Sequence, residues 1–239
     1  MQPTLSQIAL QYPAAVPVLE KYNLDYCCHG KQTLEESCKD DVEKYNRVQE
    51  VLEKITTRET GNPVVFEIME LRILISHIVN KHHSYVRESM PVILAHLTKV
   101  AAKHGEGHPE LKQVIKLFEK LADEMTLHMK KEEFVLFPAI GQMEKIRSSG
   151  NEVESKFAIE APVRMMENEH EEAGNIMKEI CELTSNYTPP SNACTTYQVM
   201  LKELQEFQGD LHQHVNLENN ILFPRALKMQ QDLLQAARH

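Results

Sequence analysis

The chain contains one pattern twice, as His128-Met-Lys-Lys-Glu132-Glu-Phe-Val-Leu-Phe-Pro138 and His214-Val-Asn-Leu-Glu218-Asn-Asn-Ile-Leu-Phe-Pro224. In each copy a Glu follows the His by four residues, and the Pro of a Leu-Phe-Pro follows the Glu by six. Positions four apart lie on one face of an α-helix, so each His and its Glu can reach a common point. Two copies in the same register indicate two helices with the same role.

Apolar residues surround both copies at steps of three and four, which is typical of the core face of a bundle helix. The first stripe is Leu111, Val114, Phe118, Leu121 and Met125, continued by Val135. The second stripe is Tyr197, Met200, Leu204, Phe207 and Leu211, continued by Ile221. Each copy therefore places an imidazole and a carboxylate at positions that belong to the core.

Two buried carboxylates require compensating positive charge, because burying an unpaired one costs several kcal/mol. No Lys or Arg lies on the first stripe between Leu111 and Val135. A bound cation is the simpler explanation, and oxygen combined with imidazole nitrogen suits iron, manganese or zinc. The repeat predicts two metal ions rather than one.

Composition and charge restrict the class of protein. With 239 residues, only 8 Gly, no Trp and long runs of period 3.6, the chain is predicted to be all-α. The net charge of −9, without a basic block, argues against nucleic acid or an acidic membrane surface as partner. The sequence shows neither a signal-peptide pattern nor an apolar run of about 20 residues, so we expect a cytoplasmic protein. Five Cys, an odd number, predict reduced thiols rather than a disulfide framework.

The chain divides into two predicted units. Residues 1–56 form a small helical unit, and the polar segment 57–63, which contains Gly and Pro, is the predicted linker. Residues 64–239 contain four long helical runs, at 64–102, 109–145, 157–186 and 192–230. Their short connections predict an antiparallel up-down four-helix bundle, preceded by the small N-terminal domain.

The remaining two helices are expected to complete the site. In the third run, His170 is the only polar member of the stripe Val163, Met166, Ala173, Met177 and Ile180. In the first run, either His82 or His83 completes the stripe Ile75, Val79, Val86, Met90 and Ile93, because both spacings are allowed. A single core His is more often hydrogen-bonded within the protein than bound to a metal, whereas the repeated pair favours a metal. Lys131, Glu133 and Glu169 are expected on a solvated face.

Four helices thus place His83 or His82, His128, Glu132, His170, His214 and Glu218 around one point. With two octahedral ions, two bridging carboxylates and a bridging oxo or hydroxo group, about two coordination positions stay open. Open positions are what reactivity at a metal requires.

Cys27 and Cys28 are candidate redox or transfer thiols. They lie close to His29, Lys31 and a predicted helix that begins with the capping box Thr33 and Glu36, a setting that can lower thiol pKa values. A buried structural pair explains them equally well. We expect them to lie outside the bundle.

Several segments resemble the iron-sulfur cluster repair di-iron proteins, the RIC family. These proteins join a short Cys-Cys domain to a hemerythrin-like bundle. The segments are Tyr26-Cys-Cys-His-Gly-Lys-Gln-Thr-Leu34, Glu169-His-Glu-Glu-Ala-Gly174, Ala193-Cys-Thr-Thr196 and Glu218-Asn-Asn-Ile-Leu-Phe-Pro-Arg-Ala226. The resemblance covers nearly the whole chain. His29 is a departure from it, because the family commonly has Gly at this position.

The resemblance implies a fold, a cofactor and a role. It selects His83 over His82 and implies two iron ions, joined by an oxo or hydroxo bridge. It implies protection of iron-sulfur clusters against oxidative and nitrosative stress, by iron donation or by nitric oxide reduction, and the residues do not decide between them. Damaged iron-sulfur proteins, nitric oxide or oxygen, and an unidentified electron donor are the implied partners, and a homodimer stays open.

An oxygen- or nitric-oxide-binding or sensing hemerythrin is the alternative. Oxygen carriers of that kind use His-x-x-x-His in the third helix and His-x-x-x-x-Asp in the fourth. Here Gly174 follows His170 by four residues, and Asn219 follows His214 by five. Two missing ligand types and the extra thiol domain argue against oxygen storage. A module that uses its metal only as a structural clip is a third interpretation.

Overall fold

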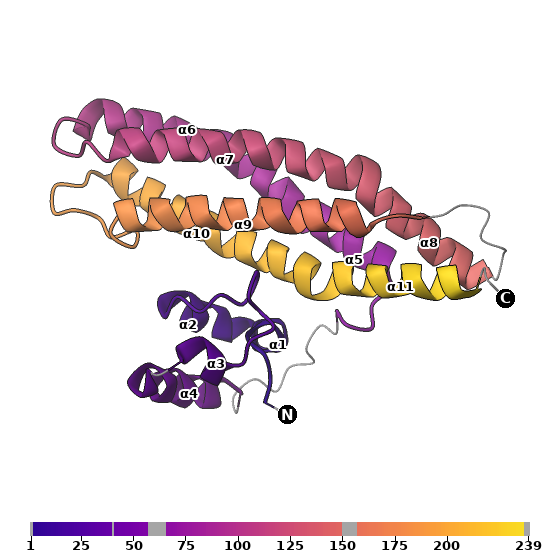
Figure 1. Cartoon of the computed structure of the whole chain (residues 1–239). Helices are drawn as coiled ribbons and strands as arrows, with labels where there is room; N and C mark the ends of the chain where they lie inside the picture. Colours follow the sequence, from indigo (N-terminus) through magenta and orange to yellow (C-terminus); the bar gives the residue numbers. More distant parts are fainter. Residues whose placement is uncertain (1, 40, 57–65, 150–156, 237–239) are drawn as a thin grey trace.

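The computed structural model describes residues 2–39, 41–56, 66–149 and 157–236, and over these residues the chain is mostly helical. Figure 1 shows a long bundle with a smaller group of short helices lying against one side. The prediction of an all-α, antiparallel four-helix bundle preceded by a small helical unit is confirmed. The predicted linker 57–63 lies outside the described residues, and the boundaries 1–56 and 64–239 stay predictions.

Short helices build the N-terminal unit around its own apolar core. They are α1 (Leu5–Gln11), the 3-10 turn η1 (Pro13–Ala15), α2 (Val16–Lys21), α3 (Leu34–Cys38) and α4 (Val42–Thr56). The side chains of Leu5, Leu19 and Tyr26 are almost fully buried there. The predicted capping box is confirmed, since Thr33 Oγ1 accepts from the N–H of Glu36 and the Glu36 carboxylate accepts from the N–H of Thr33.

Three of the four bundle helices are composite. The first is α5 (Leu71–Ile78), η2 (Val79–His83) and α6 (Ser84–His104). The second is α7 (Leu111–Lys131), η3 (Glu132–Leu136) and α8 (Phe137–Ser149). The third is α9 (Glu160–Leu183), and the fourth is α10 (Thr195–Leu217), η4 (Glu218–Leu222) and α11 (Phe223–Ala236). Helix α7 packs against α6 and α9, and α10 packs against α6.

The segments η2, η3 and η4 are π-helical turns, which contain one residue more than an α-helical turn. η3 and η4 end on the Leu of Leu-Phe-Pro. In a regular α-helix the rings of Pro138 and Pro224 would collide with the carbonyl group four residues earlier. The extra residue moves that carbonyl away, so the repeated Pro accounts for both wide turns. The sequence offers no comparable signal for η2.

The wide turns change which residues face the core. Val135, expected on the first stripe, is 61% exposed, and Leu136 takes its place at 2%. That prediction was wrong because it continued the α-helical period through a π turn. On the first helix, Leu74 and Ile78 are fully buried, whereas the expected Ile75 and Val79 are only partly buried. Ile221 is buried, as predicted.

The apolar core of the bundle is divided into two clusters. One contains Phe118 and Phe207, and the other contains Ile140 and Phe223. On the second and fourth bundle helices, the His and Glu of the repeated pattern lie between the residues of one cluster and those of the other. The bundle therefore encloses a polar layer between two apolar layers.

The N-terminal unit is attached to the fourth bundle helix by buried polar contacts. Ser6 Oγ donates to Asn216 Oδ1 at 2.6 Å, and Asn220 Nδ2 donates to the Cys27 carbonyl at 2.8 Å and to Asn216 Oδ1 at 2.9 Å. Cys27 also packs into a bundle cluster. The thiols belong to the N-terminal unit, but the loop that carries them docks on α10 and η4.

Replacing Asn216 with Ala is expected to loosen this attachment. The change leaves the buried Ser6 hydroxyl without its acceptor and removes one acceptor of the Asn220 amide, which should lower the free energy of unfolding by about 1–3 kcal/mol. Urea unfolding measures the loss, and hydrogen exchange should show lower protection in residues 2–39. The matched control is Asn46→Ala on the exposed face of α4. Equal stabilities for the two variants would contradict the account.

Candidate metal centre

Six buried polar side chains in the polar layer are candidate metal ligands, and none is more than 1% exposed. They are His83, His128, Glu132, His170, His214 and Glu218. They form two groups of candidate ligands, within each of which the donor atoms lie within 4.8 Å of one another. One group is His83, Glu132, His214 and Glu218, and the other is His128, Glu132, His170 and Glu218. The structure thus brings together all six predicted residues, and both groups share the two carboxylates.

The imidazoles meet in pairs, and each carboxylate lies between the pairs. His83 Nε2 is 3.1 Å from His214 Nε2, and His128 Nε2 is 3.0 Å from His170 Nε2. Glu218 Oε1 is 3.1 Å from His214 Nε2, while its Oε2 is 3.2 Å from His170 Nε2. Glu132 Oε2 is 3.3 Å from His128 Nε2 and 3.4 Å from His83 Nε2.

These donors fit a pair of transition-metal ions. Two imidazole nitrogens and two shared carboxylates for each ion form a donor set that suits iron, manganese or zinc. Among the described residues, both oxygens of Glu132 and Oε2 of Glu218 are buried without a hydrogen bond of good geometry. Buried oxygens of this kind are costly, and a cation between the groups satisfies all of them.

A second ring of contacts holds the imidazoles in orientation. His83 Nδ1 donates to Glu133 Oε1 at 2.7 Å, His128 Nδ1 to Glu169 Oε2 at 2.9 Å, and His170 Nδ1 to Asn219 Oδ1 at 2.8 Å. Each contact occupies the outer nitrogen and leaves Nε2 to face the centre. Among the described residues, His214 Nδ1 has no such partner.

The expectation that Glu133 and Glu169 lie on a solvated face was therefore wrong. Arg87 binds the Glu133 carboxylate and Lys131 binds that of Glu169, so both carboxylates are held between a cation and an imidazole. Their only sequence signal is adjacency, because Glu133 directly follows Glu132 and Glu169 directly precedes His170.

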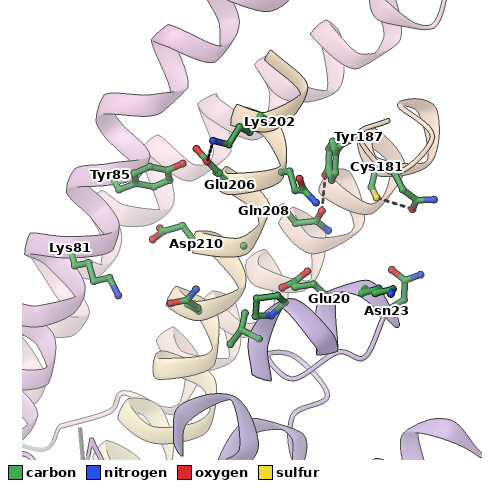
Figure 2. A pocket seen from close by; sticks show the side chains of 17 residues that line it. Glu20, Asn23, Lys81, Tyr85, Cys181, Tyr187, Lys202, Glu206, Gln208 and Asp210 are labelled. Atoms are coloured by element: carbon green, nitrogen blue, oxygen red, sulfur yellow. Dashed lines mark hydrogen bonds and ion pairs between the residues drawn. The ribbon is translucent and has the colours of Figure 1, made fainter. Parts of the chain in front are cut away.

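His82 and His83 are both fully buried, but they have different surroundings. His83 belongs to a ligand group, whereas the His82 ring stacks on His214 with centroids 5.7 Å apart. His82 Nδ1 contacts Asp210 Oδ1 at 2.9 Å. Asp210 in turn lines a cavity of about 1080 Å³ beside the N-terminal unit. Figure 2 shows Asp210 in this cavity wall, with Lys81 and Tyr85 from the first bundle helix nearby.

Protons on the imidazoles can supply positive charge to the centre without a metal. Burial lowers the pKa values of His83 and His128, but close contacts with the buried carboxylates outweigh burial and raise both to about 10. Burial raises the pKa of Glu218, but the charge of His214 and contacts with His170 and His214 hold it well below its usual value. Two imidazolium ions can thus offset Glu132 and Glu218. A bound metal cation was the simpler explanation of this charge, and protons compete with it for the same donors.

Cys27 and Cys28 lie in a separate place from the six residues. Cys27 Sγ donates to Asp25 Oδ1 at 3.2 Å and is 3.9 Å from Cys28 Sγ. The hydrogen bond with Cys28, burial and the nearby Asp25 raise the pKa of Cys27 well above its usual value. The expectation of a lowered thiol pKa was wrong for Cys27.

Glu169→Ala is expected to weaken metal binding by about 10- to 100-fold, because His128 loses the contact that orients its ring. Competition with a chelator measures the affinity. Glu172→Ala, an exposed position on the same helix, is the control and should bind as the wild type does. Similar affinities in both variants would show that Glu169 has no such role.

The metal-free chain is expected to lose stability as the pH rises from about 6.5 to about 10. His83 and His128 bind protons more tightly in the folded chain, so their contribution is complete below the unfolded pKa near 6.5 and disappears above the folded pKa of about 10. Urea unfolding at several pH values tests this. The metal-loaded chain should lack this loss, since its ligands carry no proton. A flat profile for the metal-free chain would refute the prediction.

Comparison with known proteins gives two family matches. Residues 74–226 match the hemerythrin HHE cation binding domain, and residues 1–58 match a domain of unknown function, DUF542. In the described part of the chain, no helix combines the length and apolar character needed to cross a bilayer.

Full-length relatives match along almost the whole chain. The iron-sulfur cluster repair protein YtfE of Shigella boydii serotype 4 is 36% identical over 225 residues, covering 93% of this chain and 96% of the relative. The proteins of the same name from Escherichia coli O81 and Cronobacter sakazakii are 35% and 37% identical over 223 residues. Each match covers 93% of this chain, and 96% and 95% of the respective relative. The chain belongs to the family of iron-sulfur cluster repair proteins that includes YtfE, with a hemerythrin-type bundle as its cation-binding domain.

Proposed function

We propose that the polar layer holds two iron ions and that the protein uses this centre to repair iron-sulfur clusters damaged by oxidative or nitrosative stress. The observation that carries the proposal is the pair of four-residue groups that share both Glu132 and Glu218. In this arrangement each ion would have two imidazoles of its own and would share both carboxylates with the other ion. The four helices supply these six side chains. An oxo or hydroxo bridge, expected from the resemblance, completes the proposed centre.

The pair of irons would supply redox chemistry and exchangeable iron. The protein's own residues would hold and orient it. Glu133, Glu169 and Asn219 fix three imidazoles by their outer nitrogens, so the positions of the donors do not depend on the metal alone. The apolar clusters on either side keep bulk water out of the layer. So enclosed a layer would suit a small ligand such as nitric oxide or oxygen better than a large substrate.

Iron donation is the form of repair that we favour. The relatives carry a name that refers to repair, and restoring a cluster that has lost iron requires a source of that metal. Protons compete with a metal ion for at least two of the proposed ligands, because the pKa values of His83 and His128 are raised to about 10. We propose damaged iron-sulfur proteins as the partners and the cytoplasm as the place of action.

The oxygen-carrier alternative is disfavoured by the position of Asn219. Oxygen carriers place an Asp ligand five residues after the His of the fourth helix. Asn219 occupies that position, but its Oδ1 accepts a hydrogen bond from the outer nitrogen of His170. It therefore orients a proposed ligand instead of binding the ion.

His83→Ala is expected to lose about half of the bound iron, because His83 is one of two imidazoles in its group. His82→Ala is the matched control, since His82 is equally buried but lies outside both groups. It should keep both irons. Metal analysis and the near-ultraviolet absorption of the purified variants measure the difference. Equal loss in the two variants, or greater loss in His82→Ala, would show that the wrong imidazole has been assigned to the metal.

Iron transfer is tested directly with isotopically labelled iron. The labelled protein is mixed with a dehydratase whose cluster has been damaged by nitric oxide, and the restored cluster is isolated. We expect labelled iron in the cluster and a matching loss from the donor. A cluster restored without the label, in a reaction that consumes nitric oxide, would favour nitric oxide reduction instead.

A further inference from the structure

The loop that follows α2 brings the thiols of Cys27 and Cys28 close together. Asp25 Oδ1 accepts hydrogen bonds from the backbone N–H groups of Cys27 and Cys28, at 3.0 and 2.9 Å. Side chains of adjacent residues in an extended chain point in opposite directions. The turn at Asp25 instead places the two sulfur atoms 3.9 Å apart.

This separation is close to the one that two sulfur ligands of a single ion require. With metal–sulfur bonds of about 2.3 Å, two sulfur ligands of a tetrahedral ion lie about 3.8 Å apart. Both thiols are free in the structure. Binding an ion would therefore need little movement of the loop.

Asp25 supplies a third donor. A carboxylate oxygen of Asp25 and the two sulfur atoms lie within 4.8 Å of one another. Asp25 Oδ2 is also 2.6 Å from His29 Nδ1, and this contact holds the carboxylate in place. His29 therefore acts as a positioning residue for the third donor.

We propose that Asp25, Cys27 and Cys28 form a second cation site, separate from the buried centre, that takes one divalent transition-metal ion with a preference for sulfur. Zinc, cobalt(II) and iron(II) belong to this class. The proposal stands on the geometry of the loop and does not depend on the function proposed for the bundle.

The surroundings indicate an exchangeable ion. The side chains of Asp25 and His29 are 40% and 62% exposed, whereas Cys27 is 6% exposed. Three protein donors leave a coordination position open, as in reactive sites, while structural sites are closed by four. A cavity of about 150 Å³ adjoins the loop and is lined by Cys28, His29, Asn219 and Asn220, among others.

The second site is attached to the bundle beside the centre. The Cys27 carbonyl accepts from Asn220, two residues after the proposed ligand Glu218. The neighbouring Asn219 holds the outer nitrogen of His170. The η4 turn therefore separates the two sites and contacts both.

Binding should release protons. Without an ion the Cys27 thiol is neutral, because its contacts with Cys28, burial and Asp25 raise its pKa. A cation stabilises the thiolate, so ion uptake displaces the proton and becomes tighter as the pH rises.

Cobalt(II) is the probe for the test, added to the full-length, iron-loaded protein under anaerobic conditions. We expect one cobalt per chain, intense thiolate-to-cobalt absorption, unchanged iron content, and displacement of the cobalt by zinc. Cys27→Ser with Cys28→Ser should abolish the absorption, and Asp25→Asn should weaken binding at least tenfold. Cys28→Ser alone, at a half-buried position, serves if the double variant does not fold.

A control thiol separates this site from the rest of the molecule. Cys194→Ser, at a half-buried thiol that contacts His104 instead of the loop, should leave the absorption unchanged. The proposal fails if no thiolate absorption appears, if it survives the loss of both Cys27 and Cys28, or if the added cobalt only replaces iron in the bundle.

Discussion

The burial of two carboxylates in the middle of an apolar bundle is the constraint on which the rest of the structure depends. Glu132 and Glu218 are fully removed from solvent. Four imidazoles surround them, and outer contacts with Glu133, Glu169 and Asn219 keep three of these rings in place. The layer is stable only if positive charge enters it. Metal ions and protons are the two sources that the residues allow, and the competition between them links metal affinity to pH.

The π turns give this layer its geometry. The first π turn ends with His82 and His83, and the other two begin at Glu132 and Glu218. Each adds a residue where the helix passes from one apolar cluster to the other, which rotates the following segment relative to the preceding one. In two of the three turns, a Pro follows, and its ring would clash with a backbone carbonyl if the segment were a regular α-helix. The π turns thus affect both the positions of the proposed ligands and the packing of the apolar residues beside them.

Much of this arrangement was predictable, because a repeated His-x-x-x-Glu on an apolar stripe has few explanations. The sequence predicted the four-helix bundle and named five of the six side chains that the structure brings together. Its periodicity left His82 and His83 open, and the family resemblance selected His83. Val135 was misplaced, because periodicity does not reveal an extra residue in a turn. Glu133 and Glu169 were missed, because their role depends on which neighbouring helix their side chains reach.

The position of the loop that carries Cys27 could not be predicted either, because it depends on contacts between distant parts of the chain. Adjacent thiols before a helix left two interpretations open, a reactive pair with lowered pKa values and a buried structural pair. Neither revealed that the loop docks on the fourth bundle helix through Asn220. A contact between residues 193 positions apart leaves no local signal in the sequence. The boundary between the two units stays a prediction for a related reason, since the predicted linker lies outside the described residues.

The central claim is that two irons share Glu132 and Glu218, and Mössbauer spectroscopy of the iron-loaded, oxidised protein, combined with metal analysis, tests it most directly. Shared carboxylates hold the ions close enough to couple magnetically. The account predicts two irons per chain, quadrupole doublets without magnetic splitting at low temperature and weak field, and no electron paramagnetic resonance signal from the oxidised pair. One ion per chain, or two irons with the magnetic spectra of isolated ferric ions, would contradict it.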